Sequence, residues 1–88
     1  MRYQVPPHIE VRVVHDELVV LDTRTATYHA LNPAASLIWA VLAEGGSQNA
    51  AVDALVTRFR ITPERAKVDV ESTICQLTER GLLDPDAP

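Results

Sequence analysis

The chain has 88 residues, 47% of them hydrophobic and 23% charged, which is the size and composition of one small folded domain. This length argues against a two-domain enzyme, and the net charge of −4 argues against nucleic acid, whose binders gather Lys and Arg. The single cysteine, Cys75, has no internal disulfide partner, and residues 1–11 contain no apolar signal segment. We therefore expect a cytoplasmic protein, and no apolar run is long enough for a membrane span.

Residues 9–31 have the pattern of three short strands. Residues 9–14 alternate apolar and charged side chains, which is the period of a strand with one buried face. Residues 18–21 form a second apolar tract after a predicted turn at 15–17, and residues 27–31 form a third after a turn at 22–26. The pattern predicts a three-stranded antiparallel meander.

After Leu31 the apolar period changes from two to 3.6, and three helices are predicted, at about 33–44, 48–59 and 63–80. Asn32, Ser47 and Thr62 are expected N-caps, and proline follows two of them at the first helical position. Gly45-Gly46 and Gly81 are expected helix ends. The apolar stripes predicted to face the core are Leu37, Ile38, Val41 and Leu42, then Val52, Leu55, Val56 and Phe59, then Ala66, Val70, Ile74 and Leu77. Three strands followed by three helices predict one α+β domain, 1–88, with the helices on one face of the sheet, as in a winged helix-turn-helix.

The sequence predicts neither an active site nor a cofactor. The three histidines fall on separate elements, without a cysteine or carboxylate at metal-ligand spacing; they are His8, His15 and His29. Cys75 lies in the middle of a helix, without the cations or helix N-terminus that activate a thiol. Asp84 and Asp86 are expected to belong to a solvated tail. We therefore predict a protein that is not an enzyme and binds no metal.

The third strand is the most open feature of the predicted sheet. Charged residues and Pro6-Pro7 disfavour pairing of another strand with the first strand, whereas residues 27–31 contain no formal charge and no proline. Outward N–H and C=O groups on such an edge can pair with another strand. The alternatives are that the third helix or Leu82-Leu83 covers this edge, or that it pairs in a homodimer.

Several segments together resemble the PqqD-like family. They are Val20-Leu21-Asp22-Thr23, the run from Tyr28 to Pro33, Ile38-Trp39-Ala40-Val41-Leu42, and residues 77–83. This family comprises the recognition elements that bind leaders of ribosomally made, post-translationally modified peptides, and the chain looks most like the stand-alone leader-binding component of lasso-peptide biosynthesis. Two positions depart from the family: Thr73 stands where an aromatic residue is frequent, and Arg24-Thr25-Ala26 stands where a glycine is common.

The resemblance implies that the leader is added as a fourth strand, antiparallel to the third strand, in a groove shared with the third helix. Apolar pockets would then hold leader anchors that resemble a tyrosine, a proline and a leucine. The residues carried over as peptide-binding are Thr27, Tyr28, His29, Ala30 and Leu31 on the strand, and Lys67, Val70, Glu71 and Ile74 on the helix. Lys67 and Glu71 would pair with leader charges or form a solvated ion pair with each other. The implied protein partners are a cysteine leader peptidase of transglutaminase-like fold and an ATP-dependent cyclase resembling asparagine synthetase.

Two other functions fit the same element order. A winged helix would place the third helix in a DNA major groove, although residues 62–80 contain four acidic against three basic residues. A small chaperone or subunit-like module without a peptide-binding edge is the other alternative.

Overall fold

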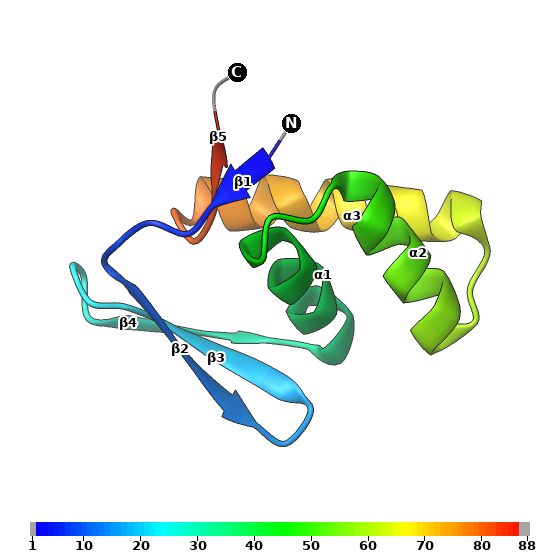
Figure 1. Ribbon diagram of the computed structural model, residues 1–88. Helices are drawn as coiled ribbons and strands as arrows, with labels where there is room; N and C mark the ends of the chain where they lie inside the picture. The colour runs from blue at the N-terminus through cyan, green and yellow to red at the C-terminus, as the bar shows by residue number, and fades with distance from the viewer. Residues whose placement is uncertain (1, 87–88) are drawn as a thin grey trace.

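The computed structural model describes residues 2–86 (Figure 1). Its elements are β1 (Arg2–Gln4), β2 (Ile9–Val14), β3 (Glu17–Asp22), β4 (Thr27–Leu31), α1 (Pro33–Ala43), α2 (Gln48–Phe59), α3 (Pro63–Glu79) and β5 (Asp84–Asp86). The antiparallel sheet β2-β3-β4 precedes the three helices, which confirms the predicted α+β class. Within the described range, no helix is both long enough and apolar enough to cross a membrane.

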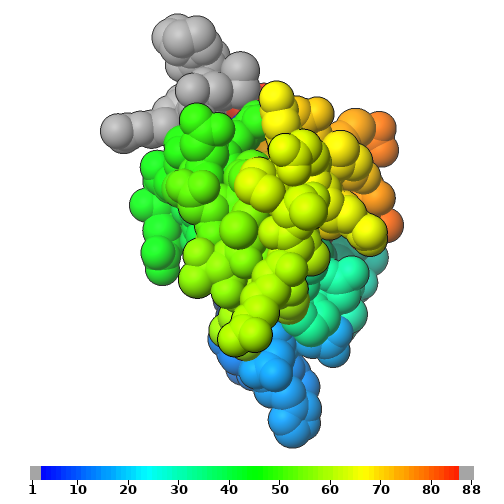
Figure 2. Space-filling view, turned by 90° about the vertical axis from the view of Figure 1, so that its right-hand side faces the viewer, coloured from blue at the N-terminus to red at the C-terminus, as the bar shows by residue number. Residues whose placement is uncertain are grey.

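The meander has β3 in the middle and β4 at one edge. Val14 pairs with Glu17, so the β2–β3 turn consists of His15 and Asp16 alone and is one residue shorter than predicted. The hairpin extends beyond the helices and projects at the bottom of Figure 2. The sheet therefore has a covered part, beneath α1, and a free tip.

The helix ends follow the predicted capping residues. The side chains of Asn32, Ser47 and Thr62 each accept a hydrogen bond from the N–H three residues later, over 2.8, 3.0 and 3.1 Å. At the end of α3, Gly81 adopts a left-handed φ of +72°, and the next N–H donates to the carbonyl of Leu77 over 2.9 Å. These bonds satisfy main-chain groups that every helix end leaves without an intrahelical partner.

The core confirms one predicted helix stripe fully and two in part. All four predicted α3 residues are buried, whereas α1 buries Ser36 and Trp39 in addition to Ile38 and Leu42. Leu37 and Val41 are only half-buried, and Phe59 at the end of α2 is 38% exposed. Because α1 lies between the sheet and the other helices (Figure 1), it packs on more than one side, and a single-stripe prediction misses that.

The two ends of the chain form a second small sheet, in which β1 pairs antiparallel with β5. The prediction of a solvated tail at Asp84 and Asp86 was therefore wrong for the main chain of this segment. Tyr3 is buried, and its hydroxyl accepts a hydrogen bond from Gln48 Nε2 over 2.7 Å. Trp39 Nε1 donates to the Leu82 carbonyl over 3.3 Å. These contacts tie β1 to α2 and the segment before β5 to α1.

Candidate functional site

The direction of the main-chain groups in β3 follows from two observations. The turn of two residues makes Val14 and Glu17 the closing pair of the hairpin, and the N–H of Thr23 donates to the carbonyl of His8 over 2.9 Å. Odd-numbered residues of β3 therefore face β2. Main-chain groups alternate in direction along a strand, so the even-numbered residues of β3 face β4.

The same alternation determines which groups of β4 lie on the open edge. Leu31, His29 and Thr27 pair with even-numbered residues of β3, so their N–H and C=O groups point into the sheet. The N–H and C=O groups of Tyr28 and Ala30 then point outward. These four groups form the hydrogen-bonding edge of the sheet on this side.

A serine of α1 stands in for the direct hydrogen bond between the Leu18 N–H of β3 and the Leu31 carbonyl of β4. Ser36 is buried; its Oγ accepts from the Leu18 N–H over 2.9 Å and donates to the Leu31 carbonyl over 3.0 Å. This bridge agrees with the assigned direction, because both main-chain groups point into the gap between the strands. It also fixes the end of β4 to α1.

Side chains leave the β4 edge accessible. Tyr28 is 68% exposed, Thr27 and Ala30 are exposed, His29 is half-buried and Leu31 is buried. The expected alternative cover, Leu82-Leu83, lies in the core next to β5. Among the described residues, the elements packed on β4 are β3 and α1, and the outer edge remains open.

A polar hollow lies between α3 and the start of α1, directly beyond the end of β4. Its volume is about 270 Å³, and it is lined by Asn32, Ala34, Ala35, Asp69, Ser72, Thr73 and Gln76. At the right of Figure 2, the yellow and orange surface of α3 lies above the teal surface around the β4–α1 junction. The hollow and the β4 edge therefore follow one another on the same side of the molecule.

The structure distributes the four predicted α3 residues differently from the expectation. Val70 and Ile74 are 1% and 9% exposed and face the core. Lys67 and Glu71 are exposed, but helical geometry puts them on the flank of the buried stripe opposite that of Thr73. None of the four lines the hollow. The predicted residues lie on the buried stripe and on one flank, whereas the hollow is lined from the other flank, and no local signal in α3 distinguishes the two flanks.

The turn before β4 is organised by a buried carboxylate. Asp22 Oδ1 accepts from the N–H groups of Arg24 and Thr25, over 3.0 and 3.3 Å, and lies 3.8 Å from His8 Nε2. Burial by itself raises the pKa of Asp22, but these hydrogen bonds and the charges of His8 and Arg24 outweigh it, so the pKa lies below its ordinary value. Ala26 completes the turn with a left-handed φ of +56°.

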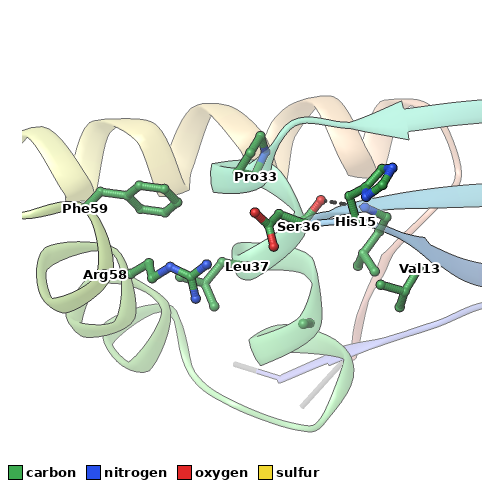
Figure 3. Close-up of a pocket in the computed structure, with 10 residues that line it drawn as sticks. Val13, His15, Pro33, Ser36, Leu37, Arg58 and Phe59 are labelled. Carbon is green, nitrogen blue, oxygen red and sulfur yellow. Dashed lines mark hydrogen bonds between the residues drawn. The ribbon is translucent and has the colours of Figure 1, made fainter.

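A second hollow, of about 230 Å³, lies between the hairpin tip, α1 and the end of α2. Figure 3 shows Val13 and His15 on the hairpin side, Leu37 on α1, and Arg58 and Phe59 on the α2 side. None of the predicted site residues lines this hollow. In residues 2–86, no group of three or more His, Cys, Asp or Glu is placed to hold a metal ion.

Comparison with known proteins agrees with the sequence resemblance. The family model described as coenzyme PQQ synthesis protein D (PqqD) matches residues 17–83. The chain belongs to the PqqD family. No curated protein matches this PqqD-family chain.

Two solved structures are similar over almost the whole domain. The structure of TbiB1 in complex with the TbiA(beta) leader peptide has a TM-score of 0.86 and 26% identity, and covers 100% of both chains. The structure of lasso peptide synthetase B1 complexed with the leader peptide has a TM-score of 0.88 and 27% identity, and covers 97% of this chain and 100% of that chain. The predicted resemblance to the PqqD-like family is confirmed.

Proposed function

We propose that this protein binds the leader segment of a ribosomally made precursor peptide, of the lasso-peptide class, as an added strand on β4. The observation that carries the proposal is the open β4 edge, with the main-chain groups of Tyr28 and Ala30 directed outward. The similarity to two leader complexes supports the choice of ligand.

Strand addition supplies affinity that does not depend strongly on ligand sequence. Tyr28 and Ala30 together offer two N–H donors and two C=O acceptors, and a peptide strand paired with them leaves its own side chains free for recognition. Thr27, His29 and Leu31 hold β4 against β3. Alternate side chains of the bound strand point toward α3, where Asp69, Thr73 and Gln76 line the near wall. Val70 and Ile74 support that wall from the core.

We further propose that the protein is a non-catalytic partner that presents the bound leader to a cysteine leader peptidase and an ATP-dependent cyclase. The resemblance to lasso-peptide leader-binding proteins supports this role. The winged-helix alternative is electrostatically unfavourable, because residues 62–80 contain more acids than bases and DNA binding depends on phosphate neutralisation.

The direction of the edge groups provides a paired test with proline. Tyr28→Pro removes an outward donor, so the protein should fold and lose roughly fivefold or more in leader affinity, the scale of one hydrogen bond. His29→Pro removes an inward donor of the β3–β4 ladder and should lower the unfolding free energy instead. Calorimetry with a synthetic leader peptide of the lasso-peptide class measures the first effect, and urea unfolding measures the second.

Tyr28→Phe is the matched control, because it keeps the main-chain N–H and should retain the parent affinity within about twofold. If the Tyr28→Pro variant is folded and binds the leader as tightly as the parent, β4 is not the docking edge and the proposal fails.

A further inference from the structure

The hollow beyond β4 contains polar side chains that the protein leaves free. Five of its seven lining residues are polar: Asn32, Asp69, Ser72, Thr73 and Gln76. Among residues 2–86, no hydrogen bond uses the side chain of Ser72, Thr73 or Gln76. In contrast, Thr78, also on α3, donates to the Ile74 carbonyl over 2.7 Å. The hollow therefore has unused donors and acceptors on its α3 wall.

The hollow lies where a strand paired with β4 would continue. Outward main-chain groups lie at Tyr28 and Ala30, and the next position, Asn32, is the N-cap of α1, whose carbonyl accepts from the Ser36 N–H over 2.8 Å, so main-chain pairing stops where the hollow begins. Asn32 is also the first lining residue of the hollow. A bound peptide that extends past Leu31 would thus direct a helix-facing side chain into the space between α1 and α3.

The two walls differ in electrostatic character. Asp69 carries the only formal charge among the lining residues, and its Oδ2 lies 3.8 Å from Arg65 Nε. Across the hollow, Asn32 Oδ1 is occupied by the Ala35 N–H at 2.8 Å, which leaves the Asn32 amide NH₂ as a donor, and the first turn of α1 is the positive end of its dipole. The α3 wall thus both accepts and donates hydrogen bonds, with one carboxylate that only accepts, whereas the α1 wall donates them.

We propose that this hollow is a specificity pocket for a side-chain amide, Asn or Gln, of the bound peptide. An amide both donates and accepts, so it can satisfy the two walls at once. An apolar side chain would remove these groups from water without supplying new hydrogen-bond partners. A carboxylate would be attracted by the positive end of α1 but repelled by Asp69, and an ammonium group would meet the reverse, so neither charge is favoured by both walls. The inference rests on the proposed strand addition and specifies one side chain of its ligand.

Selection from a displayed library of random peptides, each of about twelve residues and long enough to span β4, tests the pocket. Binders are first selected on the wild-type protein and then depleted on the Tyr28→Pro variant, so that only peptides using the β4 edge remain. We expect Asn or Gln to be enriched at one position among these peptides. The same selection on a Thr73→Val/Gln76→Met double variant, which makes these two positions of the α3 wall apolar at similar volume, should lose this enrichment.

A selected peptide then allows a thermodynamic cycle by calorimetry. Replacing its amide residue by leucine should weaken binding to the wild-type protein roughly five- to tenfold, and by less than about twofold for the double variant. Apolar residues at the enriched position, or an equal loss with both proteins, would overturn the amide pocket while leaving strand addition intact. If no selected peptide distinguishes wild type from Tyr28→Pro, strand addition itself fails, and the pocket inference fails with it.

Discussion

The Ser36 bridge predicts a large cost for a very small change. Ser36→Ala removes one oxygen atom and with it both hydrogen bonds, 2.9 Å from Leu18 N and 3.0 Å to Leu31 O. Each such bond contributes about 1 kcal/mol net, and each group left buried without a partner costs about 1–3 kcal/mol. Leu31 is buried and Leu18 half-buried, so water reaches these groups poorly. We expect the unfolding free energy to fall by about 2 kcal/mol.

Alanine also favours a helix over serine by about 0.5 kcal/mol, which would hide part of this cost. Ser72→Ala is the matched control, because it makes the same change on an exposed helical position. Urea unfolding of both variants gives the difference in their unfolding free energies. For a domain of this size, a loss of about 2 kcal/mol corresponds to a thermal midpoint lowered by roughly 8–16 °C. A difference below about 0.5 kcal/mol would refute the view that the Ser36 hydroxyl replaces a main-chain hydrogen bond between β3 and β4.

Three further predictions concern turns and charges. Ala26→Gly should raise the unfolding free energy by about 1 kcal/mol, because a left-handed φ of +56° is strained for alanine and relaxed for glycine; an unchanged or lower value in urea would count against this. Gly46→Ala should destabilise by more than about 1 kcal/mol, since a Cβ there would lie 2.6 Å from Val41 Cγ1 and 2.7 Å from the Val41 carbonyl oxygen, and a thermal midpoint equal to that of the parent would contradict it. The lowered pKa of Asp22 contributes stability at neutral pH that is lost as pH falls below about 4 and through the folded-state pKa. Asp22→Asn should flatten this part of the stability profile measured against pH, and a profile as steep as that of the parent would show that other carboxylates cause it.

Local patterns in the sequence determined the ends and identities of most elements. Asn32, Ser47 and Thr62 each bond to an N–H three residues away, and Gly81 ends α3 through its own φ angle, so these features need no information from distant parts of the chain. The α3 stripe was predictable for a related reason: α3 packs along one side, and one apolar face of period 3.6 describes it fully.

Tertiary structure decided the pairing of the chain ends and the direction of the main-chain groups on the open β4 edge. The β1–β5 pairing joins two three-residue segments, too short to show a strand period, and one of them contains a proline. The flank of α3 beside the β4 end depends on how the helix sits against α1, which no periodicity within α3 records. The outward direction of Tyr28 and Ala30 depends on the length of the His15-Asp16 turn and on the strand register, because main-chain direction alternates along a strand and a shift of one residue would reverse it.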